Sequence, residues 1–304
     1  MRYPFWTLDV FTDRAFQGNP LAVVADATGL STEQMQRIAR EFNISETTFV
    51  LPPESQDHTF RLRIFTPACE LPFAGHPTVG SAFALAAAGR VPLKGDSARV
   101  IFGENVGPVP VDIRGVDGRP TFSQLTAARL PEWGPAPPPS EALAAMLGLD
   151  PSDVLDDERD EPQSLSCGTP FLFVPLKSID AVRRARVSWE WWNQTLNSYW
   201  TQEVFLFSYE TEGQGAALHA RMFAPVLGIG EDPATGSAAA ALAGYLARRE
   251  RLTSGSARWI IEQGFEMGRP SRIELEADAA NGKLTAVRVG GQSVVVSEGH
   301  LHVP

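Results

Sequence analysis

Residues 230–249 read GEDPATGSAAAALAGYLARR, and a related block, AGHPTVGSAFALAAAGR, occupies residues 74–90. Within these blocks DPATGSA at 232–238 aligns with HPTVGSA at 76–82, an offset of 156 residues (232 − 76). Such self-similarity at half the length of a 304-residue chain indicates a duplicated fold with two matching halves. A ligand site is then expected where the halves meet, because clefts between domains are preferred binding positions.

The match extends upstream of the helix blocks. RIFTP at 63–67 corresponds to RMFAP at 221–225, an offset of 158 residues (221 − 63). The two offsets differ by two residues, which a loop between strand and helix accommodates. The repeat therefore includes a strand as well as a helix.

Each block predicts a buried helix. The bodies SAFALAAAG and SAAAALAGYLA are apolar on every side, which is typical of a helix covered on all faces. In the second block Asp232 occupies the position of an N-cap, and Pro233 that of the first helical residue. His76 holds the equivalent position in the first block, although histidine is a poor cap. Both helices are shorter than the roughly 20 residues that span a bilayer.

The remaining patterns predict mostly antiparallel strands and a few helices. Ser31 and Gln34 form a capping box for a helix that ends near Asn43. The proline-rich segment at 131–139 is the linker candidate, and PSDVLDDERDEP at 151–162 is expected to be an acidic, solvated loop. These features predict an α+β fold of two similar domains, 1–126 and 127–304, each a mostly antiparallel sheet rolled around a buried central helix. Strands are expected at 3–11, 20–25, within ISETTFVLPP (44–53), and at 60–65, 98–102, 109–114, 121–125, 171–176, 258–262, 272–276, 284–289 and 293–297.

Composition excludes several function classes. The formal charge is −10 and no basic run stands out, so nucleic acid and anionic membranes are poor partners. The N-terminal residues MRYPFWTLDVF lack the pattern of a signal peptide, so a cytoplasmic protein is expected. The two cysteines, Cys69 and Cys167, form neither a disulfide framework nor a metal-ligand set. Both are expected to be small buried hydrophobic residues.

The two helix starts suggest a carboxylate site. Each exposes unpaired N–H groups and the positive end of the helix dipole. Glycines at 75, 80, 230 and 236 would let backbone approach a ligand closely. Local sequence alone makes Asp232 an N-cap, His76 structural and Glu46 a solvated surface carboxylate.

Five blocks occur in order along the chain: GNPLAVV at 18–24, SETTFV at 45–50, ELPFAGHPTVGSA at 70–82, EDPATGSAA at 231–239 and QGFEMGRPSRI at 263–273. They resemble the signature blocks of the PhzF (phenazine biosynthesis-like) family, which is related in fold to diaminopimelate epimerase. The resemblance covers essentially the whole chain. It implies two similar domains with the active site between them, usually in a homodimer, and it allows the final strand to return to the first domain.

The resemblance also implies an activity. The characterised enzyme of the family isomerises a dihydro-hydroxyanthranilate by moving a proton along the ring, without metal or organic cofactor. Carried over residue by residue, the proton-handling and substrate-binding roles fall on eight positions. The catalytic set is Glu46, His76, Asp232 and Ser237, and the substrate-binding set is Asn19, Gly75, Gly236 and Arg269. A glutamate base fits this chemistry, because desolvation in a closed cleft raises the pKa of a carboxyl group.

Two alternatives stay open. Related epimerases and proline racemases use a cysteine at each helix start, but here neither cysteine lies in those positions. An amino-acid racemase or epimerase that uses Glu46 and Asp232 remains an alternative. A non-catalytic protein that binds a small molecule on the same fold is the other.

Overall fold

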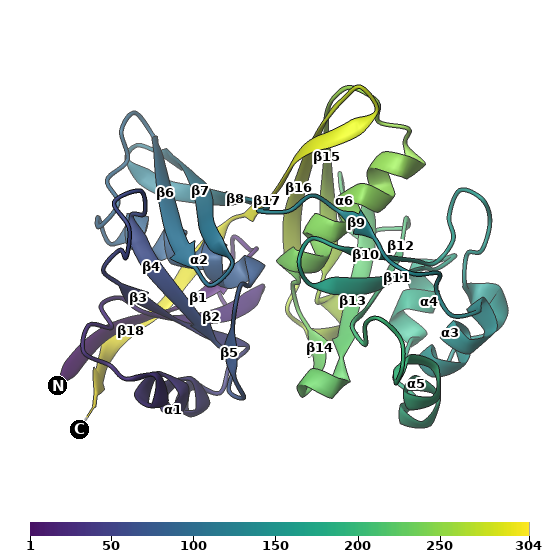
Figure 1. Ribbon diagram of the computed structural model, residues 1–304, viewed down its shortest axis with the longest axis horizontal. Helices are drawn as coiled ribbons and strands as arrows, with labels where there is room; N and C mark the ends of the chain where they lie inside the picture. Colours follow the sequence, from purple (N-terminus) through teal and green to yellow (C-terminus); the bar gives the residue numbers. More distant parts are fainter. Residues whose placement is uncertain (304) are drawn as a thin grey trace. The chain divides into compact units, whose positions relative to one another are not determined.

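In the computed structural model, which describes residues 1–303, the chain divides into two compact units. Unit 1 comprises Met1–Ala128 together with Val289–Pro304, and unit 2 comprises Arg129–Arg288 (Figure 1). The first boundary between the units thus falls after residue 128. The predicted domains, 1–126 and 127–304, stay a prediction. The predicted α+β class is confirmed.

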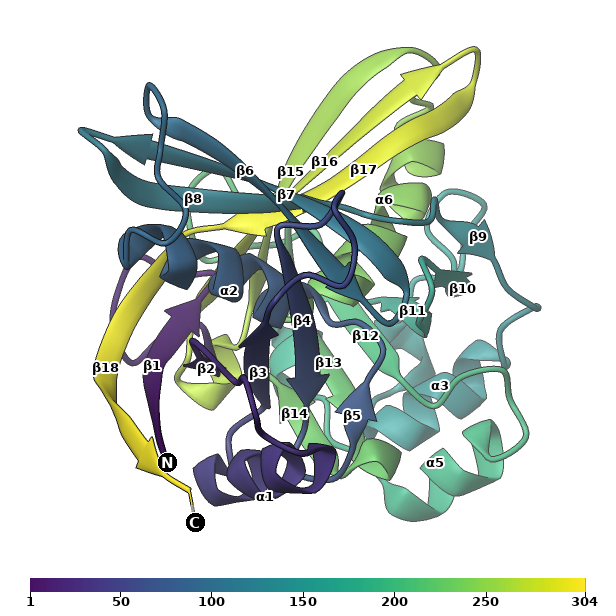
Figure 2. The same ribbon diagram turned by 60° about the vertical axis from the view of Figure 1, so that its left-hand side comes forward.

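Unit 1 is a sheet wrapped around helix α2. Figures 1 and 2 show α2 (Gly75–Ala87) among the strands of this unit, with α1 (Thr32–Phe42) outside them. The first strand pairs antiparallel with the last, β18. The strands are β1 (Arg2–Val10), β2 (Asn19–Val24), β3 (Glu46–Leu51), β4 (Phe60–Phe65), β5 (Glu70–Leu71), β6 (Ser97–Glu104), β7 (Gly107–Val116), β8 (Arg119–Thr126) and β18 (Ser293–His302).

Unit 2 has its own sheet around helix α6 (Gly236–Arg249), with three helices outside it: α3 (Ser140–Leu147), α4 (Ile179–Arg184) and α5 (Trp189–Leu196). Short 3-10 turns cover Pro151–Asp153, Pro225–Leu227 and Phe265–Met267. The strands are β9 (Glu132–Trp133), β10 (Gln163–Ser166), β11 (Pro170–Pro175), β12 (Val204–Ser208), β13 (Leu218–Ala224), β14 (Ile229–Asp232), β15 (Gly255–Gln263), β16 (Ser271–Ala280) and β17 (Lys283–Gly291), which runs on into unit 1.

Strand pairing repeats between the units. In unit 1, β2 pairs parallel with β3, β3 antiparallel with β4, and β4 parallel with β6. In unit 2, β11 pairs parallel with β12, β12 antiparallel with β13, and β13 parallel with β15. The strand leaving each central helix, β6 or β15, then pairs antiparallel with the next, β7 or β16. Each unit therefore uses the same order of strand directions, as the sequence repeat predicts.

The central helices are buried because most of the side chains that they present to the sheet are small or apolar. All residues of α2 from Gly75 to Ala86 are buried, and most of α6 is. Close packing depends on Gly80, where an added Cβ would lie 2.6 Å from Leu21 Cδ2 and 2.6 Å from Val10 Cγ2. Gly80 therefore serves the approach of α2 to β1 and β2, and not the approach of a ligand.

Gly80→Ala is expected to destabilise the protein by about 1–3 kcal/mol, because overpacking outweighs the better helix propensity of alanine. Gly230→Ala is the matched control, since an added Cβ there meets nothing within 4 Å. Urea unfolding of both variants measures the difference. Equal stability of the two variants would show that α2 can move away from the sheet without cost.

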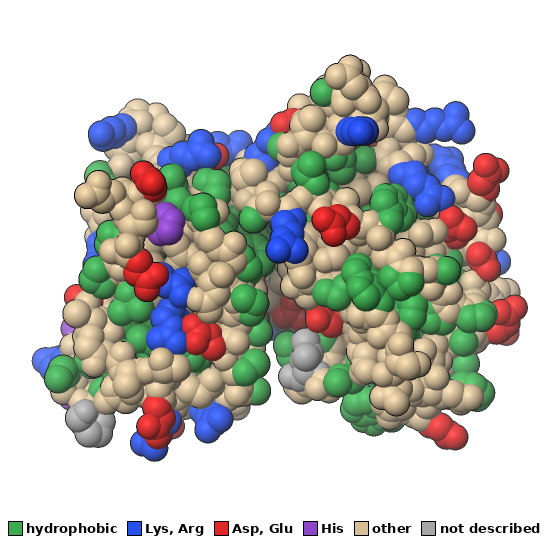
Figure 3. All heavy atoms as spheres, in the orientation of Figure 1, with side chains coloured by type: hydrophobic (Ala, Val, Ile, Leu, Met, Phe, Trp, Pro, Cys, Tyr) green, Lys and Arg blue, Asp and Glu red, His purple; other side chains and the backbone are tan. Residues whose placement is uncertain are grey.

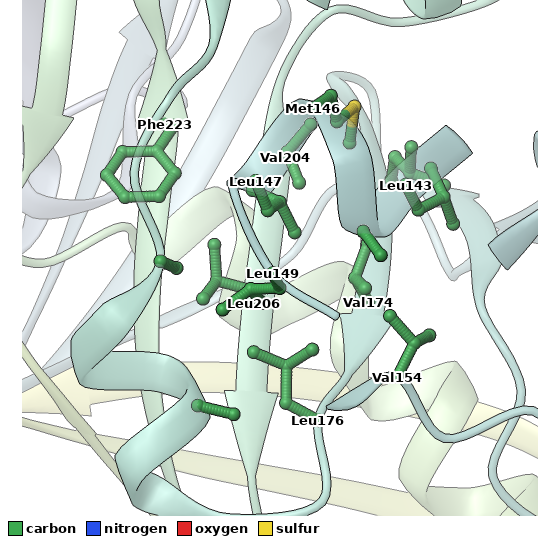
Figure 4. Close-up of a cluster of buried hydrophobic side chains, with 14 of the residues drawn as sticks. Leu143, Met146, Leu147, Leu149, Val154, Val174, Leu176, Val204, Leu206 and Phe223 are labelled. Carbon is green, nitrogen blue, oxygen red and sulfur yellow. The ribbon is translucent and has the colours of Figure 1, made fainter. Parts of the chain in front are cut away.

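A second apolar core fills the space between the sheet of unit 2 and its outer helices. Figure 4 shows side chains from α3 facing others from β11–β13, and Trp192 of α5 is fully buried in the same cluster. Members labelled in Figure 4 are Leu143, Met146, Leu147, Leu149, Val154, Val174, Leu176, Val204, Leu206 and Phe223. This cluster packs on β11–β13 from outside, while α6 contacts β10, β11 and β16 and reaches β12 through Phe207 and Tyr245.

The predicted caps are right for α1 and wrong for α6. Ser31 accepts from the Gln34 N–H, the Gln34 side chain accepts from the Ser31 N–H, and Asn43 closes the helix in a left-handed conformation. Asp232, by contrast, is the last residue of β14 and not an N-cap, and the helix does not begin at Pro233. It begins four residues after Asp232, at Gly236. The two copies of the repeat therefore differ at the helix start. Helix α2 begins one residue before His76, whereas α6 begins four residues after the equivalent Asp232.

Three other expectations are corrected. The linker candidate is in part a strand of unit 2: β9 pairs with β10, and the Gly134 N–H donates to the Ser164 carbonyl. Cys69 is exposed rather than buried, because it lies in the turn after β4 that Thr66 closes through its hydroxyl. Asp160, in the acidic loop expected to be solvated, is buried where it accepts from Tyr209 and Arg249.

Candidate active site

The first cluster of candidate residues lies in unit 1, around Glu46 and His76. Glu46 begins β3 and His76 is the second residue of α2, and both are buried. Two residues after Glu46 on the same face of β3, the Thr48 hydroxyl bonds the Ser81 hydroxyl of α2 at 2.9 Å. This contact turns the Glu46 side chain toward the helix start, where its Oε2 lies 3.2 Å from His76 Nε2.

The protonation state of His76 follows from its surroundings. Burial lowers the pKa of His76 to about 3, although a hydrogen bond to the Pro20 carbonyl opposes this shift. The ring is therefore neutral at pH 7 and carries one N–H. Since Pro20 takes that hydrogen and Nε2 makes no hydrogen bond, Nδ1 is the donor and Nε2 is an acceptor. A proton can then be held between Nε2 and the Glu46 carboxyl group, and it can pass between them.

The two binding candidates of unit 1 flank this pair. Asn19 begins β2, is fully buried and precedes Pro20, whose carbonyl orients His76. Gly75 is the first residue of α2, and the N-cap Ala74 has no side chain that could bond the first-turn N–H groups. All four predicted residues of unit 1 thus lie at one end of α2.

A chain of hydrogen bonds fixes the first turn of α2. The Thr78 hydroxyl lies 2.8 Å from the Ala74 carbonyl and 2.6 Å from Glu104 Oε1 at the end of β6. A hydroxyl has one hydrogen, and a carbonyl has none. If Thr78 donates to Ala74, the contact with Glu104 requires a proton on the carboxyl group, which then donates to Thr78. Burial raises the pKa of Glu104 to about 8, against the opposing effects of Thr78 and Arg61, so the acid is protonated at neutral pH.

The second cluster lies in unit 2, around Asp232. The Thr235 hydroxyl donates to Asp232 Oδ2 at 2.6 Å. Gln263, the last residue of β15, donates through Nε2 to the Thr235 hydroxyl at 2.9 Å and to the Asp232 carbonyl at 2.7 Å. The Thr235 N–H donates back to Gln263 Oε1 at 3.0 Å. These bonds hold residues 232–235 in a non-helical conformation, which explains why the helix starts only at Gly236.

Ser237 and Gly236 occupy the first turn of α6. Ser237 is half-buried, and the N-cap Thr235 makes no side-chain cap, because its hydroxyl is used by Asp232. Both central helices therefore begin without a side-chain cap and without an acidic residue in the first turn. Their N–H groups are suited to an anionic group of a substrate.

Arg269 is placed by the loop that follows β15. Its N–H donates to the Gly264 carbonyl, and an added Cβ at Gly264 would lie 2.5 Å from the Arg269 carbonyl and 2.6 Å from the Pro233 carbonyl. Gly264 also has a positive φ of 79°. The loop thus packs directly on the segment before α6, and only glycine fits at its start.

A buried histidine anchors the same loop. His219 of β13 lies between Glu262 (3.2 Å) and Glu266 (2.9 Å). Burial alone lowers the pKa of His219, but the two carboxyl groups outweigh it and raise the pKa to about 9. The resulting buried cation ties the loop to the sheet.

Sequence reasoning missed two side chains that bond a threonine at the start of a central helix. Glu104 bonds Thr78 at the start of α2, and Gln263 bonds Thr235 at the start of α6. A signal existed for one of them, since Gln263 opens the block QGFEMGRPSRI. No pattern marks Glu104, because the relation of β6 to α2 appears only in three dimensions. Among residues 1–303, no group of three or more His, Cys, Asp or Glu side chains is arranged to hold a metal ion.

Neither composition nor surface suggests a polyanionic partner. Basic and acidic side chains are interspersed on the face drawn in Figure 3. No helix within the described part of the chain is long and apolar enough to cross a membrane.

Comparison with known proteins agrees with the predicted fold. The family model described as phenazine biosynthesis-like protein, PhzC-PhzF, matches residues 8–299. The chain belongs to this family. A PhzF-family phenazine biosynthesis protein of Bacillus anthracis, solved by crystallography, is 28% identical, with a TM-score of 0.88 and coverage of 100% of both chains.

Two curated relatives of this PhzC-PhzF chain are named isomerases. An uncharacterized isomerase of Mesorhizobium japonicum is 44% identical over 300 residues, 97% of each chain. The trans-2,3-dihydro-3-hydroxyanthranilate isomerase of Pseudomonas aeruginosa is 38% identical over 297 residues, 97% of this chain and 98% of the relative. The predicted family and the predicted enzyme class, isomerase, are therefore confirmed.

Proposed function

We propose that this protein is a cofactor-independent isomerase that moves a proton on a small cyclic substrate bearing a carboxylate, and that both clusters act on one substrate molecule bound between the domains. The observation that carries the proposal is the buried contact between Glu46 and a neutral His76. A carboxyl group beside a neutral imidazole can accept a proton from carbon, exchange it with solvent and deliver a proton back to carbon.

The steps follow from the residues. Glu46, as carboxylate, takes a hydrogen from a ring carbon as a proton. The electron pair left behind delocalises over the adjacent double bond, and Glu46 returns the proton at the far carbon, so no atom is gained or lost. His76 orients Glu46 and can share its proton. Uncapped N–H groups at Gly75 and Gly236 hold the substrate carboxylate, while Asp232 and Ser237 bond polar groups of the ring. Asn19 and Arg269 shape the binding site.

Proton NMR in heavy water tests this function. The wild-type protein is incubated with trans-2,3-dihydro-3-hydroxyanthranilate, the compound named for the Pseudomonas aeruginosa relative, and with other carboxylated cyclic dienes. A shifted double bond with deuterium at the ring carbon is the expected result. A compound that binds but neither rearranges nor exchanges would instead indicate a binding protein. Sedimentation of the same sample tests the homodimer that we propose.

An epimerase is a second candidate, because each cluster contains an acidic residue, Glu46 in one and Asp232 in the other. Its substrate would exchange deuterium at a stereocentre and change configuration without moving a double bond. A two-thiol mechanism is not part of this candidate, since Cys69 is exposed in a turn and Cys167 follows β10. Replacing both cysteines by alanine should leave the exchange intact.

A further inference from the structure

The duplicated fold gives Glu46 a counterpart that the family blocks do not contain. In unit 1, Phe65 of β4 pairs with Thr47 of β3. The strands of the repeat are offset by 158 residues, so the equivalent of Phe65 in unit 2 is Phe223 (65 + 158). Phe223 pairs with Val204 of β12. One residue before Thr47 is Glu46, and one residue before Val204 is Glu203. The two glutamates therefore occupy equivalent positions in the two units.

Glu203 also faces the equivalent neighbour. The helix-block offset of 156 residues carries His76 to Asp232, and Asp232 lies opposite Met222 of β13. Met222 also pairs with Phe205 of β12. Residues directly opposite one another share a face of the sheet, and so do residues two apart on a strand, so Glu203 lies on the face that carries Asp232.

That face is turned toward the central helix. Phe207, two residues after Phe205, packs edge-on against Tyr245 of α6 with ring centroids 5.5 Å apart. Backbone bonds hold Glu203 in place, because its carbonyl accepts from the Leu172 N–H and its own N–H donates to the Thr201 hydroxyl. The carboxyl group is half-buried in this position.

We propose that Glu203 is the counterpart of Glu46 and acts through Asp232, the two carboxyl groups being coupled electrostatically so that together they keep a single proton. Glu203 is thus a positioning residue that keeps the second cluster able to donate as well as to accept a hydrogen bond. The substrate anion accepts a hydrogen bond from the protonated pair, and the proton stays with the pair when Glu46 reprotonates the ring, so no proton is gained or lost in a turnover. This inference rests on the proposed function.

The electrostatics of the pair agree with its geometry. Burial raises the pKa of Glu203 to about 7, and the negative charge of Asp232 contributes in the same direction. Two negative charges that interact cannot both form without a cost in free energy. The proton lost near pH 7 therefore belongs to the pair of carboxyl groups. The equivalent pair of unit 1 avoids this repulsion because Asp232 is replaced there by the neutral His76.

The first test needs no substrate. Protein labelled with carbon-13 at the carboxyl groups of Asp and Glu is titrated by NMR between pH 4 and 10. A carboxyl signal that titrates near pH 7 in the wild type and is lost in Glu203→Gln is the expected result. The signal of Glu104, expected near pH 8, is identified with Glu104→Gln. A spectrum in which the remaining carboxyl groups all titrate below pH 5 would overturn the proposal.

The second test is the pH profile of deuterium exchange. Since the pair loses its proton as the pH rises through about 7, the wild-type rate should fall above that pH. Glu203→Gln keeps a hydrogen-bond donor and removes the titration, so its rate should not fall across pH 6–8. Glu203→Asp should restore the fall of the exchange rate above pH 7. The control is Glu158→Gln, which replaces an exposed glutamate of the same unit and should show the same fall as the wild type. An identical fall in Glu203→Gln and wild type would refute the proposal.

The two tests separate this inference from the proposed function. A carboxyl signal that titrates near pH 7 and depends on Glu203, in a protein that exchanges none of the dienes, would uphold the pair and reject the isomerase substrate. Exchange of a diene with no such signal would uphold the isomerase and reject the pair.

Discussion

Glu46→Gln is expected to lower the rate of deuterium exchange at the ring carbon by about 10²–10⁴-fold, the usual range for loss of a general base. Glutamine has the shape of glutamate but cannot accept a proton from carbon. Its amide can still lie beside His76 Nε2, an acceptor, so the first cluster should stay folded. The loss should therefore appear in the rate of chemistry and not in the amount of folded protein.

The control is Glu41→Gln, which removes an exposed glutamate from the same unit. Exchange rates and urea-unfolding curves are measured for both variants and the wild type. If Glu46→Gln exchanged deuterium at the wild-type rate, another group would have to take the proton, and the proposed chemistry would be wrong. Because burial holds the pKa of His76 at about 3, protonation of this ring should cause no loss of rate between pH 5 and 8.

The stability of the wild type is expected to fall as the pH rises from about 5 to above 8, through the buried acid Glu104. Its pKa rises from 4.5, the ordinary value, to about 8 in the folded protein. The folded state therefore binds the proton more tightly than the unfolded state, so its contribution is complete below pH 4.5 and is lost through pH 8. The expected loss is on the order of a few kcal/mol.

Glu104→Gln should remove this part of the pH dependence. Its amide N–H can donate to the Thr78 hydroxyl as Gln263 does to Thr235 in unit 2. Urea unfolding at pH 5 and pH 9 gives the change in stability for each protein. Because Glu203 has a raised pKa and acts in the same direction, the difference between variant and wild type is the informative quantity. Equal changes in both would show that Glu104 holds no proton in the folded state.

Repetition and local pattern made much of the fold predictable. The apolar bodies of α2 and α6 have no polar face to expose, and FRLRIF alternates as a half-buried strand must. The capping box of α1 depends on residues three apart and needs no distant partner. These elements are determined by side chains within one turn of helix or one strand.

The start of α6 was not predictable in this way. Local preference assigns Asp232 to a cap and Pro233 to a first turn, but hydrogen bonds with Gln263, 31 residues after Asp232, hold this segment in a non-helical conformation. Burial of Glu46 is a similar case, since it depends on the bond between Thr48 and Ser81 across two elements. At such positions, hydrogen bonds from residues distant in the sequence override the local preference for helix or surface. A single sequence does not show which distant residues will be close.

The pairing of β18 with β1 has a consequence for synthesis of the chain. The sheet of unit 1 is incomplete until residues 293–302 are available, whereas unit 2 ends at Arg288. On a translating ribosome, β1 must therefore wait with an unpaired edge while every residue of unit 2 emerges. Unit 2 can fold first, and the sheet of unit 1 closes only after it.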